Sequence, residues 1–290
     1  MPNKTTWAAP AFLGALGAVF LFTACSGGDS TAVQFGTPAW YWQAAQDTFK
    51  SGDFSKADQH LAEIVKGDNE WKQRAAVWQV VLLTGLVRGN KDIVEACKQG
   101  MEQNKAAIAT LQNPVQQHQR DARKFTVELL ESWTDLKQAI GDGQTIAFNF
   151  PFPAGNASES PILGTIRKGT VLDAVQLAEA VNATLQRGVL LDVTEYVGAR
   201  DDVPKAQAMF NTLPVQVSAV EFWNEVGVNL FEMSPLFGVK QINEPRIRKL
   251  VLERSLDCLA GALASSNEGL KKSAEKKKAE IEKELKNIKV

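Results

Sequence analysis

The sequence predicts an all-α fold built from antiparallel helix pairs, and three observations predict it. Apolar residues recur every three or four positions over 39–140 and again over 170–264, which is the spacing of amphipathic helices. Glycine, aspartate and proline interrupt this pattern and divide it into segments of helix length. Strand-like alternation is confined to 146–152. Of the 290 residues, 44% are hydrophobic and 22% are charged, so the chain can form a packed core.

Residues 1–24 differ from the rest and predict an export signal. Lys4 is their only charge, and an apolar run leads to the small residue Ala24, directly before Cys25. A positive start, an apolar middle and small residues before a cleavage site form the secretory pattern. The segment Leu21-Phe22-Thr23-Ala24-Cys25 resembles the lipobox of bacterial lipoproteins. The resemblance implies that Cys25 is lipidated and becomes the first residue of the mature chain, whose partner is the lipid bilayer. The alternative is an uncleaved anchor, because the apolar run is about one membrane span long.

Residues 25–37 are rich in serine, glycine, aspartate and threonine, which predicts a flexible linker between lipid and domain. Ser26 follows the cysteine, where enterobacterial lipoproteins kept at the inner membrane carry aspartate. By that analogy, we expect the periplasmic face of the outer membrane.

An N-terminal helical region is expected over 38–140. Gly52-Asp53 ends its first helix, and Gly89-Asn90 is expected to turn the chain between a third helix and a fourth. Pro114 is expected to precede the fifth helix. The expected helices are 39–51, 54–66, 70–88, 93–101 and 115–140.

Residues 141–169 break the helical pattern and predict a loop or a short β-hairpin insertion. Phe148, Phe150 and Phe152 alternate with other residues, which is the period of a strand, and a hairpin would pair them with 162–166. The three rings either pack onto the helices or form an exposed apolar patch for a partner.

A C-terminal helical region is expected over 170–265, including a helix whose start, Ser218-Ala219-Val220-Glu221, matches a capping box. The tail, 266–290, consists mainly of Lys, Glu and Ala and predicts a solvated, partly frayed helix. Its only apolar line is Ala274, Ile281, Leu285 and Ile288.

Two helix pairs share a spacing that resembles the tetratricopeptide repeat. Small residues precede a Gly-Asp or Asp turn, and an aromatic or branched residue follows it, near 41–64 and near 190–213, with a poorer copy around Trp78. The resemblance implies a right-handed solenoid of stacked pairs, because one pair cannot bury its apolar face alone. It also implies a concave groove that binds a protein segment.

No motif in the sequence indicates catalysis, a metal or a cofactor. His60 and His118 lack a second ligand at helical spacing and are interpreted as solvated. The acidic residues Asp192, Glu195, Asp201 and Asp202 are interpreted as a surface face or a turn cap. Cys97 and Cys258 are either two buried thiols or a disulfide.

We therefore expect a non-enzymatic lipoprotein that acts as a protein-interaction scaffold in the envelope. The net charge of −1 argues against a nucleic-acid partner. Trp40, Tyr41 and Trp42 are consecutive on an expected helix, so their rings point in different directions and at least one should face outward. Trp40 and Trp42 therefore join the three phenylalanines as candidate partner-binding residues. The alternative is a lipoprotein that binds a small apolar or glycan ligand near 145–169.

Overall fold

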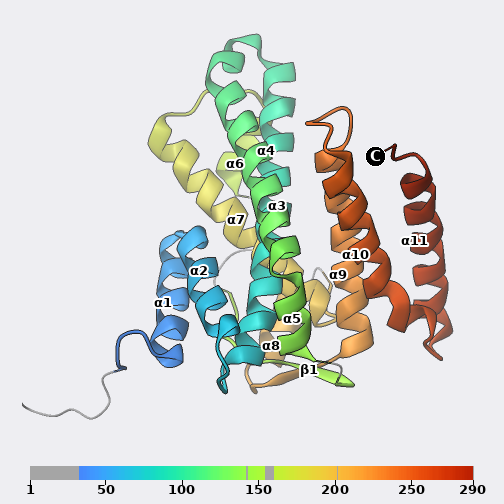
Figure 1. The fold of residues 1–290 in the computed structure, drawn as a ribbon. Helices are drawn as coiled ribbons and strands as arrows, with labels where there is room; N and C mark the ends of the chain where they lie inside the picture. The colour runs from blue at the N-terminus through green and yellow to red at the C-terminus, as the bar shows by residue number, and fades with distance from the viewer. Residues whose placement is uncertain (1–32, 142, 154–159, 201, 290) are drawn as a thin grey trace, which may run out of the picture. The chain divides into compact units, whose positions relative to one another are not determined.

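The computed structural model describes residues 33–141, 143–153, 160–200 and 202–289. The expected signal, Cys25 and most of the expected linker lie outside these residues. From Gln34 onwards the chain forms one compact unit. Its described part is predominantly helical, with eleven α-helices and a single two-stranded sheet, which confirms the predicted helical class (Figure 1).

Helices α1 (Pro38–Ser51) and α2 (Phe54–Lys66) form the predicted first pair. Gly52 adopts a φ of 83°, in the left-handed region where glycine carries no steric penalty. Asp53 then caps α2, because its side chain accepts a hydrogen bond from the Lys56 amide. The two residues therefore make the tight turn that the sequence predicts.

Helix α3 (Lys72–Gln103) is continuous, so the turn predicted at Gly89-Asn90 is wrong. Gly89 lies inside the helix where α7 approaches closely, and a Cβ there would lie 2.9 Å from the Leu185 Cα. The Asn90 side chain donates to the Leu86 carbonyl at 2.7 Å and accepts from His118 Nδ1 at 2.8 Å. Both residues serve helix packing, and His118 is buried rather than solvated.

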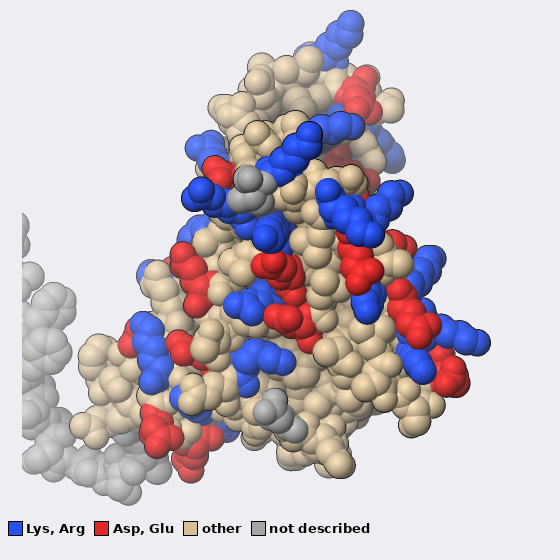
Figure 2. Space-filling model, turned by 45° about the vertical axis from the view of Figure 1, so that its right-hand side comes forward, with Lys and Arg blue, Asp and Glu red and all other residues tan. Residues whose placement is uncertain are grey.

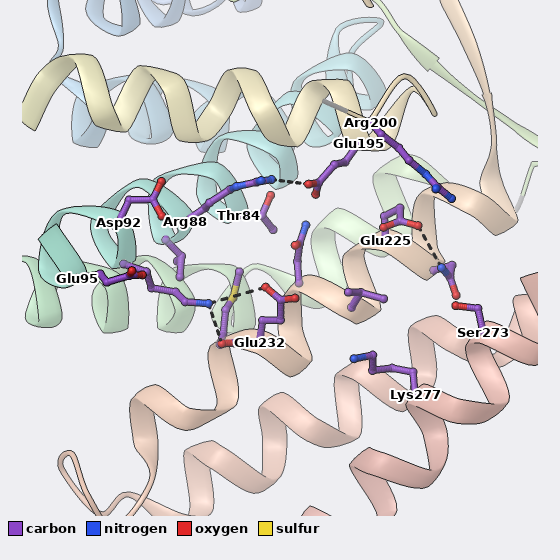
Figure 3. Close-up of a pocket in the computed structure, with 16 residues that line it drawn as sticks. Thr84, Arg88, Asp92, Glu95, Glu195, Arg200, Glu225, Glu232, Ser273 and Lys277 are labelled. Atoms are coloured by element: carbon purple, nitrogen blue, oxygen red, sulfur yellow. Dashed lines mark hydrogen bonds and ion pairs between the residues drawn. The ribbon is translucent and has the colours of Figure 1, made fainter. Parts of the chain in front are cut away.

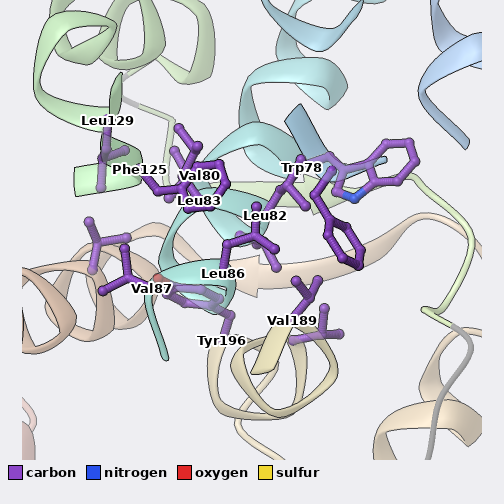
Figure 4. Packing of buried hydrophobic residues seen from close by; sticks show 14 of the residues in the cluster. Trp78, Val80, Leu82, Leu83, Leu86, Val87, Phe125, Leu129, Val189 and Tyr196 are labelled. Atoms are coloured by element: carbon purple, nitrogen blue, oxygen red, sulfur yellow. The ribbon is translucent and has the colours of Figure 1, made fainter. Parts of the chain in front are cut away.

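Helix α3 is the element around which the others pack. Helices α4 (Ile108–Glu131) and α7 (Ala174–Tyr196) lie along it, and α2, α5 (Trp133–Ile140) and α6 (Pro161–Arg167) also contact it. Pro114 lies inside α4 rather than before it. Figure 4 shows the core at this junction, which includes Trp78, Val80, Leu82, Leu83, Leu86, Val87, Phe125, Leu129, Val189 and Tyr196.

These contacts differ from those of a solenoid, in which each repeat touches only its neighbours in sequence. The long contact between α3 and α7 joins segments about 100 residues apart. The described elements thus confirm helix pairing at α1–α2, whereas the stacking of successive pairs is not confirmed.

Strands β1 (Thr145–Phe148) and β2 (Val215–Ser218) pair antiparallel, with Thr145 opposite Ser218 and Phe148 opposite Val215. The alternating pattern that includes Phe148 therefore correctly predicts strand β1, but the strand that pairs with β1 is distant in sequence. The hairpin to 162–166 is wrong, because these residues are helical in α6. Pro161 occupies the first turn of that helix, where its fixed φ favours the helix.

The C-terminal region contains α8 (Val203–Met209), α9 (Ala219–Met233), α10 (Pro245–Leu263) and α11 (Glu268–Lys286). The predicted cap at Ser218 is confirmed, since its Oγ accepts a hydrogen bond from the Glu221 amide. Asp202 caps α8 in the same way.

The charged tail is not a solvated helix. Helix α11 packs on α10 (Figure 1). At this contact Ile281 is fully buried against Leu252 and Leu259. An ion pair between Arg248 and Glu284 joins the same two helices. The predicted apolar line is correct, and it is long enough to hold α11 against the domain.

Candidate functional site

A polar cleft with a volume of about 630 Å³ opens between α3, α9 and α11. Figure 3 shows charged and polar side chains from these helices, and from the end of α7, facing one another across it. A second cavity of about 640 Å³ overlaps its end near Arg200 and the first turn of α11. Volumes of this size suit a small ligand or a short segment of a partner.

One side of the cleft is fixed by an ion-pair cluster between α3 and α7. Arg88 Nη1 lies 2.7 Å from Glu195 Oε1 and 3.2 Å from Asp192 Oδ1. Asp192 is completely buried, and burial raises the pKa of its carboxyl to about 7 although Arg88 acts in the opposite direction. Burial lowers the pKa of the Arg88 guanidinium, but the two carboxylates outweigh it and raise that pKa above its ordinary value.

A chain of hydrogen bonds crosses the floor of the cleft. The Tyr196 hydroxyl donates to Thr84 Oγ1 at 3.1 Å and accepts from Asn229 Nδ2 at 3.0 Å. Burial raises the pKa of Tyr196 well above its ordinary value, so the phenol is neutral and able to donate. The chain links α3, α7 and α9 and fixes their relative positions at the site.

The far end of the cleft is rich in hydrogen-bond acceptors. Asn224 Nδ2 donates to Glu225 Oε1 at 3.3 Å, while the buried Asn224 Oδ1 has no donor among the described residues. Burial raises the pKa of the Glu225 carboxyl, and Arg200 partly opposes this. Figure 3 shows Arg200, Glu225 and Ser273 converging on this end. Arg200 has a φ of 50°, in the left-handed region that non-glycine residues rarely adopt.

The lysines of the cleft have acidic partners. Lys277 of α11 lies 3.0 Å from Glu280 and 4.5 Å above the Phe231 ring, and Lys91 lies 3.9 Å from Glu232. Figure 2 shows basic and acidic side chains interleaved over one face rather than gathered into a field of one sign. The cleft therefore combines both charges at short range.

Three of the five aromatic residues predicted to bind a partner lie in the core. Trp42, Phe148 and Phe150 are buried, and the Phe150 ring stacks on Trp78 with centroids 5.6 Å apart. Phe152 is half-buried against Phe210. The packing alternative is thus correct for Phe148 and Phe150, and these rings offer no surface to a partner.

Trp40, like Phe152, is only half-buried, and its ring belongs to a group of aromatic side chains at the surface. Its half-buried ring lies 4.5 Å from the ring of Phe35, which is 78% exposed, and 5.1 Å from Tyr41. The His60 ring adds a third neighbour at 5.6 Å. We name Phe35, Trp40, Tyr41 and His60 the aromatic cluster. Cys25, the predicted lipid site, lies outside the described residues.

Sequence reasoning missed the cleft because its residues come from four separate segments. The one available signal was the acidic group that includes Asp192 and Glu195, which the sequence indicated as a surface face or turn cap. Their partner Arg88 lies 104 and 107 positions away. Cys97 and Cys258 are buried free thiols rather than a disulfide.

Comparisons with protein-family models, with curated proteins and with solved structures found no match to this chain. Among the helices that the structure describes, none combines the length and the apolar character needed to cross a bilayer.

Proposed function

We propose that this chain is a lipid-anchored envelope protein that binds a polar segment of a protein partner in the cleft between α3, α9 and α11. The observation that carries the proposal is the cleft itself, with about 630 Å³ of space lined by charged and polar side chains from α3, α7, α9 and α11. Facing polar groups of both signs suit a polar segment of a protein partner.

The proposed anchor is acylated Cys25 at the periplasmic face of the outer membrane. Ten positions separate Cys25 from Phe35, which is a reach of at most about 35 Å for extended chain. The aromatic cluster is thus the described surface nearest to the anchor in sequence. Tryptophan and tyrosine rings favour the interface between lipid and water, so the cluster supports a position of α1 close to the bilayer.

The scaffold function rests on binding rather than catalysis. The α1–α2 pair supports a tetratricopeptide-like element, and we propose that such pairing, here built around α3, presents the cleft to the partner. The interleaved charges in Figure 2 and the net charge of −1 support a protein partner rather than a nucleic acid.

The alternative is a small glycan-type ligand near the predicted loop. A cavity of about 250 Å³ lies beside Ala147 and Asn149 and is lined also by Glu70, Gln73 and Arg74. Arg74 lies over the Trp71 ring at 3.2 Å, and its buried Nε has no acceptor among the described residues. Sugar hydroxyls could supply one. This cavity is smaller than the cleft, so we rank it second.

The experiment that tests the proposal is photo-crosslinking in native membranes. A photoreactive residue at Val228, which lines the cleft, is compared with the same residue at Gln112, an exposed position on α4. We expect one discrete crosslinked protein from Val228 and none from Gln112. Identical products from both positions, or none from Val228, would contradict the proposal.

A further inference from the structure

The first half of α7 presents apolar side chains that no described part of the chain covers. Val175 is 68% exposed, and Val171, three positions before the helix, is 51% exposed. Residues 174–183 include only one charged side chain, Glu179, and most of them are exposed. The second half of the same helix is largely buried and packs on α3. Apolar side chains left exposed in this way indicate a surface that another body covers.

Helices α1 and α7 meet on one side of the domain. Gly52, at the end of α1, lies against Asn182 of α7, since a Cβ on Gly52 would lie 2.6 Å from Asn182 Oδ1. Figure 1 shows α1 and the first half of α7 on the same side, with α10 and α11 on the opposite side. The aromatic cluster at the start of α1 and the apolar start of α7 therefore flank the contact between these two helices.

The proposed anchor brings one occupant to this side. Ten positions separate Cys25 from Phe35, so acyl groups on Cys25 would hold the start of α1 within at most about 35 Å of the bilayer. The tether keeps lipid next to this side at all times, whereas it does not bring a second copy of the chain there. The occupant that fits best is thus the bilayer to which the chain is attached.

We propose that the domain rests on the bilayer through an α1–α7 face, which consists of the aromatic cluster together with Val171 and Val175. Tryptophan and tyrosine rings favour the interface between lipid and water, and the two valines remove further apolar area from water. Lys168 is exposed three positions before Val171 and provides a cation for lipid phosphate groups. This inference rests on the proposed anchor at Cys25.

This orientation has a consequence for the cleft. Helices α9 and α11, which border the cleft, lie away from α1 in Figure 1. A domain that rests on its α1–α7 face therefore keeps the cleft outside the bilayer, where a protein partner can reach it.

Fluorescence quenching by lipid tests the inference. The full-length protein, purified from membranes with its anchor, is placed in liposomes of phosphatidylethanolamine and phosphatidylglycerol that contain doxyl-labelled lipid. The fluorophore NBD is attached to Val175→Cys, and to Val239→Cys as the matched control. Val239 is an exposed valine as well, at 79%, in the loop that leads into α10. We expect blue-shifted emission at position 175 and quenching at least twice that at position 239.

A second substitution identifies the side chains that make the contact. Val171→Asp, introduced into the labelled Val175→Cys protein, places a charge in the proposed face and should reduce the quenching at least twofold. Lys240→Asp, at an exposed position in the loop before α10, should leave the quenching unchanged. Neither substitution should lower the melting temperature, because both side chains are exposed.

Equal quenching at positions 175 and 239 would overturn the inference. If Cys25 incorporates palmitate in that case, the anchor stands and only the α1–α7 face is wrong. If the protein neither incorporates palmitate nor floats with the liposomes, the anchor fails, and this inference fails with it. Blue-shifted emission at position 175 without quenching by lipid would assign the face to a second copy of the chain and would also overturn the inference.

Discussion

Gly85 of α3 and Gly188 of α7 bring the two helix backbones into direct contact. A Cβ built on Gly188 would lie 2.3 Å from the Gly85 carbonyl oxygen, and one built on Gly85 would lie 2.4 Å from the Val189 Cα. Arg88 follows Gly85 by about one turn of α3, and Asp192 follows Gly188 by about one turn of α7. The ion pair between Arg88 and Asp192 fixes one side of the cleft. The glycine contact thus sets the helix separation at which the ion pair forms.

Substitution at this contact should destabilise the fold. Gly188→Ala places a methyl group where backbone atoms already lie, and such overpacking costs about 1–3 kcal/mol in the free energy of unfolding. Gly164→Ala in α6 is the matched control, since no atom other than those of its chain neighbours and its own helix backbone lies within 4 Å of its Cβ position. The control should stabilise by about 0.5–1 kcal/mol, because alanine is the better helix residue. Urea unfolding of both variants measures the difference; equal effects would show that α3 and α7 do not touch at Gly188.

The buried Asp192 predicts a pH dependence of stability. Its pKa is raised from 3.8 in the unfolded chain to about 7 in the fold, so the folded state binds the proton more tightly between these values. Raising the pH through this window removes that proton from the buried carboxyl, and the buried charge that results raises the free energy of the folded state. The contribution of Asp192 to the free energy of unfolding should therefore fall as the pH rises from about 4 to about 7, by up to about 1.4 kcal/mol per pH unit.

Asp192→Asn isolates this contribution, because the amide does not titrate and Arg88 retains Glu195 as a partner. We expect the difference in unfolding free energy, variant minus wild type, to increase with pH across the window. Urea unfolding at several pH values gives this difference. A difference that does not change with pH would show that Asp192 has an ordinary pKa.

Helix α11 should contribute to stability as part of the domain. Ile281→Ala removes a fully buried side chain between Leu252 and Leu259 and should cost about 2–5 kcal/mol. Glu282→Ala, at the next and exposed position, should change stability by less than about 0.5 kcal/mol. Similar small effects for the two would indicate that α11 is solvated, as the sequence predicts from its charge.

If Cys25 is the lipid anchor, it carries the acyl groups of the native protein. Radiolabelled palmitate should enter the native protein and should not enter Cys25→Ala, because the resemblance to a lipobox places the acyl groups on that residue. The aromatic cluster adds a second test: brominated lipid should quench wild-type tryptophan fluorescence more than that of Trp40→Phe. Equal palmitate labelling of the native protein and Cys25→Ala would contradict the anchor.

Features governed by neighbouring residues could be predicted from the sequence. The turn at Gly52-Asp53 and the cap at Ser218 depend on local backbone chemistry, and the apolar line of α11 depends on helical spacing alone. The turn predicted at Gly89-Asn90 is wrong, although glycine followed by asparagine is typical of a turn. Here glycine instead permits close helix contact, and only the position of α7 reveals this.

Features that join distant segments could not be predicted. The strand period of 146–152 gave β1, but nothing local identifies 215–218 as its partner. The cleft requires α3, α7, α9 and α11 to be placed together, and its central carboxylate, Glu225, has no distinguishing neighbours in sequence. Phe148 and Phe150 are core residues because β1 lies over α3, a contact that periodicity does not contain.

Accessibility of the cleft in native membranes tests the central claim most directly. A thiol-reactive maleimide is applied to Ser273→Cys, on the cleft side of α11, and to Glu275→Cys, an exposed position outside the cleft. Background labelling from Cys97 and Cys258 is low because both are buried, and burial raises their thiol pKa to about 11 and about 12. The third cysteine, Cys25, is blocked by the proposed acylation, and the parent protein without a new cysteine gives the remaining background. If a partner occupies the cleft, Ser273→Cys is protected in membranes and reacts after purification, while Glu275→Cys reacts equally in both. Equal reactivity of Ser273→Cys in membranes and after purification would contradict the claim that this cleft binds a partner.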